Sequence, residues 1–185
     1  MPTIQDQIKK LQPHNIVLVM TTADKYHAVN TEVLRYYLTK LRKTCIYVSM
    51  NRPAIAMQKV LGKEGVETKR VFFIDCITAI AEPHGMTRAG NIVFVTSPQN
   101  LTDMSIAISE AAEQIKKGER FLFFDSLSTL SLYNESESVA KFAHFLTTKL
   151  RELDIAAVFL LLEKETDQKI INNIAQFCDN VVEIK

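Results

Sequence analysis

The sequence of 185 residues predicts an α/β fold: a three-layer α/β/α sandwich with a mostly parallel sheet. Short runs of apolar and β-branched residues recur along the chain, as is typical of strands that are buried on both faces. Between these runs, apolar residues repeat every three to four positions, which indicates amphipathic helices. Strands that alternate with helices favour a parallel sheet covered by helices on both sides.

Seven segments are expected to form the strands of this sheet. Each is a short run of mostly apolar residues, rich in the Val, Ile and Phe that strands favour. In chain order, the predicted strands are 16–20, 45–49, 71–75, 92–96, 121–125, 155–162 and 181–184.

Three longer helices are predicted between the strands, each from a stripe of apolar residues on one helical face. The stripes consist of Val29, Val33, Leu34, Tyr37, Leu38 and Leu41; then Leu101, Met104, Ile108, Ala111 and Ile115; then Val139, Phe142, Leu146, Leu150 and Leu153. Shorter helices are expected over 54–61, with Gly62 as the stop, and over 167–177. Residues 4–11 form either a short helix across the sheet or an arm.

The organisation of the chain predicts one domain over residues 1–185, because it contains no linker, internal repeat or low-complexity tract. The longest irregular stretch is expected over 80–90. Loops of that length are often functional or mobile.

Composition is that of an ordinary globular protein, with 47% apolar and 23% charged residues and a net charge of +1. The charge is unevenly spread: residues 1–92 carry 13 Lys and Arg against 7 Asp and Glu, and residues 93–185 carry 9 against 14. A basic first half is compatible with an anionic partner, yet the charges fall mostly on predicted helices, where a solvated face requires them. Without interleaved aromatic residues, nucleic-acid binding is weakly supported.

The three cysteines and the hydropathy pattern predict a cytoplasmic protein. Cys45, Cys76 and Cys178 form no CxxC pair and lie beside apolar runs, as expected in a reducing compartment. The longest unbroken apolar run, 155–162, is far shorter than the roughly 20 residues of a membrane-spanning helix. The N-terminus lacks the apolar centre of a signal peptide, so neither secretion nor membrane insertion is expected.

One motif with chemical potential follows the strand predicted at 121–125. Four apolar residues end in Asp125 and Ser126. In nucleotide-binding α/β proteins, an aspartate at the carboxyl edge of the sheet holds Mg²⁺ for a triphosphate. An acidic residue at the end of a strand is also common as a turn or N-cap group, so the motif alone does not decide.

The order of segments around this motif resembles the RecA-like ATPases, and most closely their KaiC-like branch, which is abundant in archaea. The resemblance extends over roughly residues 14–184 and rests on the segments YVSMNRP, VFFIDC and IVFVTS that precede FLFFDS. It implies a RecA/KaiC-like P-loop NTPase fold and an association of domains side by side.

The phosphate-binding loop of that family is degenerate here. A Walker A motif, GxxxxGK[ST], needs glycines because its backbone N–H groups turn inward around the phosphate. The chain has no glycine before Gly62, and the segment after the first predicted strand is TTADKYHAVN. Thr21, Thr22 and Lys25 are the candidate remnants of a nucleotide site, together with Asp125 and Ser126, although Asp24 opposes anion binding beside Lys25.

The catalytic base of the family is also missing. The resemblance places paired glutamates shortly after the second strand, where one of them activates the attacking water. This chain has Asn51 and Arg52 there, and neither can accept a proton at neutral pH. Loss of both the phosphate loop and the base argues against ATP hydrolysis.

Two interpretations of Asp125 remain open. In the first, its carboxylate caps the following turn and Ser126 bonds nearby backbone. In the second, Asp125 binds a metal ion, with Asp75 at a neighbouring strand end as a possible second ligand.

Three functions are therefore considered. The first is a non-catalytic KaiC/RecA-like domain, a pseudo-ATPase in regulation, signalling or assembly that binds a protein partner or itself and needs no cofactor. The second is an ATPase that binds Mg-ATP through a non-standard phosphate loop. The third is a DNA-associated accessory protein of the recombinase type. The missing glycines weigh against the second, and the acidic second half weighs against the third.

Overall fold

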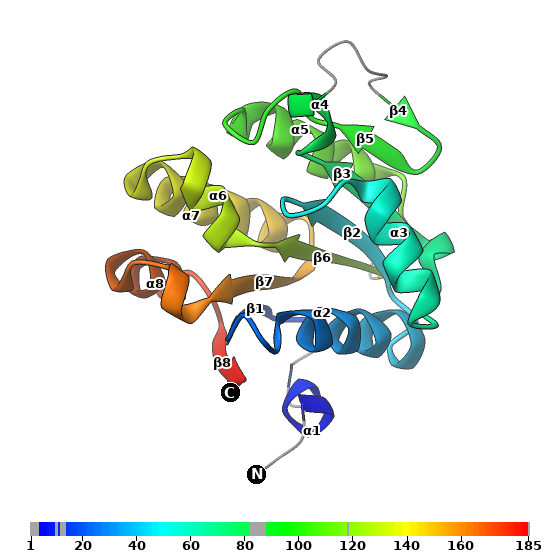
Figure 1. Ribbon diagram of the computed structural model, residues 1–185, viewed down its shortest axis with the longest axis horizontal. Helices are drawn as coiled ribbons and strands as arrows, with labels where there is room; N and C mark the ends of the chain where they lie inside the picture. Colours follow the sequence, from blue (N-terminus) through cyan, green and yellow to red (C-terminus); the bar gives the residue numbers. More distant parts are fainter. Residues whose placement is uncertain (1–3, 10, 12–13, 82–87, 118, 185) are drawn as a thin grey trace.

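The computed structural model describes residues 4–9, 11, 14–81, 88–117 and 119–184 (Figure 1). At its centre is an eight-stranded sheet with the order β4-β5-β3-β2-β6-β7-β1-β8. Neighbouring strands are parallel except β4 and β5. The strands are β1 (Ile16–Thr21), β2 (Thr44–Ser49), β3 (Val71–Asp75), β4 (Arg88–Ala89), β5 (Ile92–Phe94), β6 (Arg120–Asp125), β7 (Ala156–Leu162) and β8 (Asn180–Ile184).

The helices of the described residues cover both faces of this sheet. They are α1 (Ile4–Ile8), α2 (Tyr26–Arg35), α3 (Ala54–Lys63), α4 (Thr78–Ala81), α5 (Leu101–Glu113), α6 (Leu127–Tyr133), α7 (Ser136–Glu152) and α8 (Gln168–Ala175). Helix α2 continues as a short π-helix, η1 (Tyr36–Lys40), and two 3₁₀ turns are η2 (Thr68–Arg70) and η3 (Glu163–Glu165).

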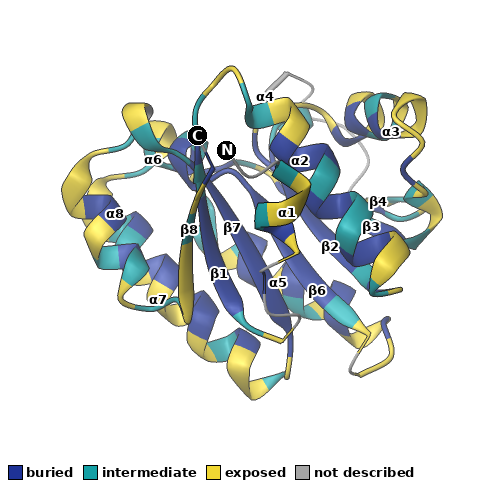
Figure 2. Cartoon of the chain, turned by 90° about the horizontal axis from the view of Figure 1, so that it is seen from below, coloured by how far each residue is buried: buried dark blue, intermediate teal, exposed yellow. Residues whose placement is uncertain are grey.

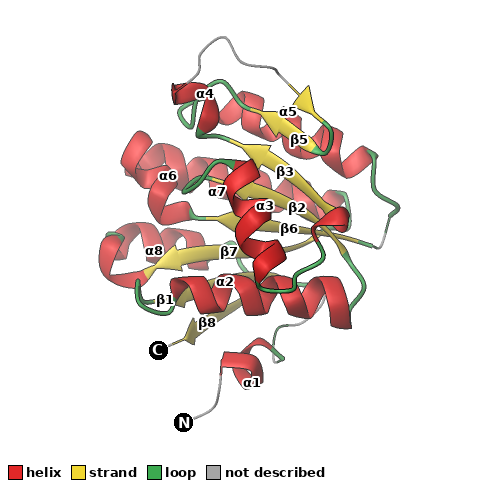
Figure 3. Cartoon of the chain, turned by 45° about the vertical axis from the view of Figure 1, so that its right-hand side comes forward, coloured by secondary structure: helices red, strands yellow, loops and turns green. Residues whose placement is uncertain are grey.

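The helices form two layers with the sheet between them (Figure 3). Helices α1, α2 and α3 bury their apolar residues on one face, and α5, α6, α7 and α8 bury theirs on the other. Along β6 the side chains alternate between the layers, with Phe123 on the α2 side and Phe124 on the α7 side. The predicted three-layer α/β/α sandwich with a mostly parallel sheet is therefore confirmed.

The central strands are the most deeply buried part of the molecule (Figure 2). Phe121 of β6 stacks on Tyr37, with ring centroids 4.3 Å apart, and Phe124 lies 6.2 Å from Phe142 of α7. Burial of each such side chain stabilises the fold by about 1.5–3 kcal/mol. Within the described residues, no helix is long and apolar enough to cross a membrane.

The predicted strands and longer helices agree with the structure apart from local differences, and the short helices α4 and α6 were not predicted. All seven predicted strands are present, but the short antiparallel strand β4 was not expected. Helix α3 continues through Gly62, the expected stop, to Lys63; Gly65 instead has the left-handed conformation, with φ +73°, that ends a helix. The predicted irregular stretch 80–90 begins at the end of α4 and includes β4, while residues 82–87 lie outside the described residues.

The register of the sheet brings three strand ends together. Ser49 at the end of β2 is paired with Asp75 at the end of β3 and with Asp125 at the end of β6. Because these strands are parallel, all three residues lie at the carboxyl edge, where open α/β sheets bind their ligands.

Candidate functional site

Asp125 lies at the centre of a buried polar network at this edge. The residue is 2% exposed, and the peptide bond that joins it to Ser126 is cis. Tyr26 and Asn51 donate hydrogen bonds to Oδ1, the Asn51 bond being 3.0 Å long. Tyr47 and Asn30 donate to Oδ2, the Asn30 bond being 2.9 Å long. Each carboxylate oxygen therefore has one tyrosine donor and one asparagine donor.

The donors also bind one another in pairs. Asn51 Nδ2 donates to the Tyr26 hydroxyl oxygen over 2.7 Å, and Asn30 Nδ2 donates to the Tyr47 hydroxyl oxygen over 2.9 Å. Thr129 of α6 donates to Asn51 Oδ1. The network thus connects α2, β2, the segment after β2, β6 and α6.

Local structure explains how these residues meet. Tyr26 and Asn30 are one helical turn apart at the start of α2, so they lie on the same face. Tyr47 belongs to β2, the strand next to β6. Asn51 follows the end of β2, where Ser49 Oγ donates to the carbonyl oxygen of Arg52 over 2.5 Å and helps to fold the turn.

The electrostatics of the site follow from burial. Burial raises the pKa of the Asp125 carboxyl, and the four hydrogen bonds oppose this effect without cancelling it. Burial and then the neighbouring Asp125 charge raise the pKa of the Tyr26 and Tyr47 hydroxyls. Both tyrosines therefore stay protonated at neutral pH and act as donors to the carboxylate.

The cap of the following helix is made by Ser126 and not by Asp125. Ser126 is the N-cap of α6, and its Oγ accepts from the backbone N–H of Thr129 over 3.3 Å. The first interpretation is thus confirmed for Ser126, which bonds nearby backbone. It was wrong for Asp125, because both carboxylate oxygens accept from side chains of α2, β2 and the segment after β2.

Asp75 has a separate set of partners. It accepts from the backbone N–H groups of Ala54, Ile77 and Thr78 at 2.7–2.9 Å and from the Thr78 hydroxyl at 2.7 Å. Asp75 and Asp125 lie on strands that flank β2, so their backbones are about 10 Å apart at the usual strand spacing. Among the described residues, no group of three or more His, Cys, Asp or Glu side chains is placed to hold a metal ion.

The structure does not bring the other sequence candidates into this network. Thr21 ends β1, and its buried hydroxyl donates to the Ile184 carbonyl oxygen over 3.1 Å. The Thr22 carbonyl oxygen accepts from the Lys25 backbone N–H over 3.1 Å. Thr22 and Lys25 line an open hollow of about 580 Å³ with Asp24, Glu163, Lys164 and Gln168.

This arrangement does not fit the magnesium–triphosphate group that the fold family implies. The motif GxxxxGK[ST] needs two glycines, whereas residues 22–25, which separate β1 from α2, contain none. The Lys25 N–H, which a phosphate would need, is bonded within this turn. Tyr26 directly follows the turn, and its hydroxyl bonds to the carboxylate that would face the metal ion.

Three members of the network were not found from the sequence: Tyr26, Asn30 and Tyr47. Tyr47 lies inside an apolar strand. Tyr26 and Asn30 belong to the segment after β1, where the resemblance places the phosphate-binding loop. The spacing of four residues between Tyr26 and Asn30 was the available signal, because it places two polar groups on one helical face.

Comparison with solved structures shows the class of fold: an α/β fold that matches KaiC-like, RecA-type neighbours. A protein of Pyrococcus horikoshii, PH0321, solved in complex with an unknown peptide, superposes with a TM-score of 0.73 and 14% identity, covering 96% of this chain and 80% of its own. The KaiC-like protein PH0186 of the same organism superposes with a TM-score of 0.62 and 13% identity, covering 93% of this chain and 72% of its own. The flagellar accessory protein FlaH of Methanocaldococcus jannaschii superposes with a TM-score of 0.62 and 13% identity, covering 97% of this chain and 75% of its own.

The sequence itself belongs to the family DUF7504, a family of unknown function, whose pattern matches residues 15–184. No curated protein matches the chain.

Proposed function

We propose that this chain is a non-catalytic KaiC-like domain, a pseudo-ATPase that acts in regulation, signalling or assembly through contacts with other protein chains. The observation that carries the proposal is the saturation of Asp125 by the chain's own side chains. Two tyrosines and two asparagines occupy both carboxylate oxygens. A hydrated magnesium ion would have to displace these donors, and a buried donor left without its acceptor costs about 1–3 kcal/mol.

The position of the expected catalytic base supports the same conclusion. Asn51 lies where the resemblance to KaiC-like proteins places a glutamate, and an amide cannot take a proton from water at neutral pH. Its side chain is bonded to Tyr26, Asp125 and Thr129. Asn51 therefore acts here as a connector between the segment after β2 and α6.

A role in protein contacts is supported by one of the structural relatives. The Pyrococcus horikoshii protein PH0321 was solved in complex with an unknown peptide. Loss of catalytic residues does not require loss of a contact surface elsewhere on the same fold, since sites are separate from the core that specifies the fold.

The test is thermal unfolding with ATP, ADP or GTP, each with and without Mg²⁺. A ligand that binds only the folded state, present at a hundred times its dissociation constant, stabilises it by about 2.7 kcal/mol. For a domain of this size, that is a rise in Tm of roughly 5–11 °C. We expect no rise at millimolar nucleotide for the wild-type chain or for Lys25→Ala.

The opposite result would favour an ATPase with a non-standard phosphate loop. In that case, Mg-ATP raises the Tm of the wild-type chain, and the rise is lost in both Lys25→Ala and Asp125→Ala. A rise that persists in both variants also contradicts the proposal, because it places a nucleotide elsewhere on the domain.

A further inference from the structure

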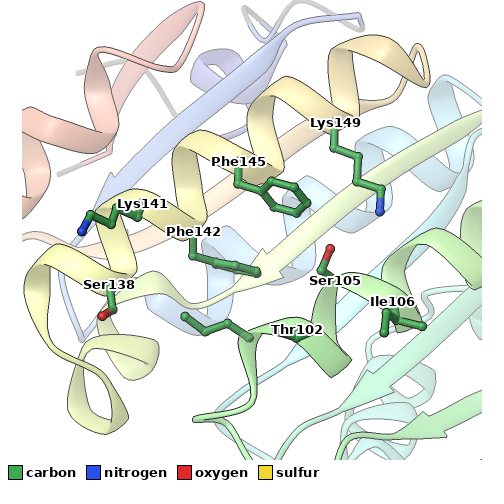
Figure 4. Close-up of a pocket in the computed structure, with 9 residues that line it drawn as sticks. Thr102, Ser105, Ile106, Ser138, Lys141, Phe142, Phe145 and Lys149 are labelled. Carbon is green, nitrogen blue, oxygen red and sulfur yellow. The ribbon is translucent and has the colours of Figure 1, made fainter.

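An apolar groove lies between α5 and α7, on the face of the sheet opposite α2 (Figure 4). It has a volume of about 580 Å³. Leu101 and Ile106 contribute from α5, and Phe142 and Phe145 from α7. The groove thus lies between two helices and is separate from the Asp125 network.

Two apolar side chains that line the groove are unusually exposed. Ile106 is 50% exposed and Phe145 is 52% exposed, while Phe142 is buried and packs against the core. In Figure 4, Phe142 and Phe145 project from α7 toward α5. Exposed apolar side chains gathered around a groove are typical of a protein interaction site.

The charged groups that line the groove are both positive. Lys141 and Lys149 lie toward opposite ends of the α7 side (Figure 4). Lys141 pairs with Glu137 at the helix surface over 2.6 Å. The Lys149 ammonium lies 5.8 Å from the centre of the Phe145 ring, so a cation borders the exposed aromatic side chain.

The charge at the groove indicates the chemistry of its occupant. Lys141 is already paired with Glu137, so Lys149 is the lining cation that has no carboxylate partner among the ion pairs of the described residues. An acidic partner would meet Lys149 with opposite charge beside the exposed Phe145 ring. An amphipathic helix suits a groove between two helices, because it presents its apolar side chains on one side.

We infer that the α5–α7 groove binds an amphipathic helix of another protein, one with apolar anchors on one face and Asp or Glu beside them. The apolar anchors pack between Ile106 and Phe145, and an acidic side chain pairs with Lys149. This inference rests on the proposed role in protein contacts, for which it names the surface and the chemistry of the partner.

The experiment is selection from a displayed library of helical peptides against the wild-type chain, with counter-selection against Phe145→Ala. We expect enriched peptides with apolar residues at positions i, i+3 or i+4, and i+7, flanked by Asp or Glu. One such peptide, labelled and titrated by fluorescence anisotropy, should bind at least tenfold more weakly to Ile106→Ala and Phe145→Ala. Because both side chains are half exposed, these variants keep the fold, which circular dichroism checks.

Ile55→Ala is the matched control, because Ile55 is 52% exposed on α3, away from the groove. Its affinity should stay within twofold of the wild type. Lys149→Glu should weaken binding of the acidic peptide. A peptide with Lys in place of the acidic residues should bind this variant better than it binds the wild type. Loss of affinity in Ile55→Ala equal to that in Ile106→Ala would overturn the inference.

Three further outcomes overturn the inference. These are failure of the library to enrich, enrichment of neutral or basic peptides, and a concentration-dependent dimer in sedimentation that Phe145→Ala abolishes. The last result would assign the groove to a second copy of the chain. The nucleotide titration remains a separate measurement, so failure of the groove and failure of the pseudo-ATPase proposal are distinguishable.

Discussion

Replacement of Tyr26 by Phe tests whether the network around Asp125 holds the carboxyl edge together. The substitution keeps the ring and removes only the hydroxyl, which donates to Asp125 Oδ1 and accepts from Asn51 over 2.7 Å. Oδ1 then keeps a single donor, Asn51, at 3.0 Å. A hydrogen bond to a charged group contributes about 1.5–3 kcal/mol, so we expect a loss of about 2 kcal/mol in the free energy of unfolding.

The assay is chemical and thermal unfolding followed by circular dichroism. A loss of about 2 kcal/mol corresponds to a fall in Tm of roughly 4–8 °C for a domain of 150–250 residues. Tyr36→Phe is the control, because Tyr36 is half-buried and its ring lies edge-on to Tyr37, 5.6 Å away, in the same helical segment. We expect this variant to stay within about 0.5 kcal/mol of the wild type.

The double variant Tyr26→Phe/Tyr47→Phe extends the test to the whole network. Both hydroxyls bind the same carboxylate. The loss of unfolding free energy in the double variant should therefore differ by about 0.5–3 kcal/mol from the sum of the losses in the two single variants. If Tyr26→Phe destabilises no more than Tyr36→Phe, or if the two network substitutions add, the carboxylate is not held in the way described and the argument for a filled site fails.

Two other predictions concern Asp125 and Ser126. Burial raises the folded-state pKa of Asp125 above its unfolded value, so its contribution to stability is present in acid and declines as pH rises through the raised pKa. We therefore expect the free energy of unfolding of the wild type, minus that of Asp125→Asn, to fall from acidic toward neutral pH. Denaturation series at several pH values measure this difference, and a difference that is constant or grows with pH contradicts the prediction. Ser126→Ala removes the N-cap of α6 and should cost about 1 kcal/mol in urea unfolding. Ser138→Ala, inside α7, should cost less, and equal losses would argue against the cap.

The fold was predictable because its central strands are buried on both faces. Runs such as the one ending at Asp125 remain apolar along their whole length, and this pattern does not depend on the partners of a strand. Helix α6, over Leu127–Tyr133, was not predicted, because its seven residues are too few to establish a helical period. Strand β4 has only two residues, and its pairing with β5 is decided by contacts outside the segment.

The candidate site was predictable only at its centre. The motif indicated Asp125, but its donors come from positions 74 to 99 residues earlier in the chain. Their convergence depends on the order of β2 and β6 in the sheet and on the angle at which α2 leaves β1. Neither is encoded in a local pattern, so Tyr47 was indistinguishable from any other residue of an apolar strand.

The position of β1 has a consequence for synthesis of the protein. Within the part of the chain that the structure describes, this strand pairs with β7 and β8 alone, and Thr21 bonds to a residue 163 positions later. At translation rates of about 5–20 residues per second, β1 leaves the ribosome roughly 10–30 s before its last partner does. Its apolar edge is unpaired during that interval, so folding cannot proceed from the N-terminus onward. The sheet is complete only when the final strands arrive, and until then the unpaired edge of β1 is prone to aggregation.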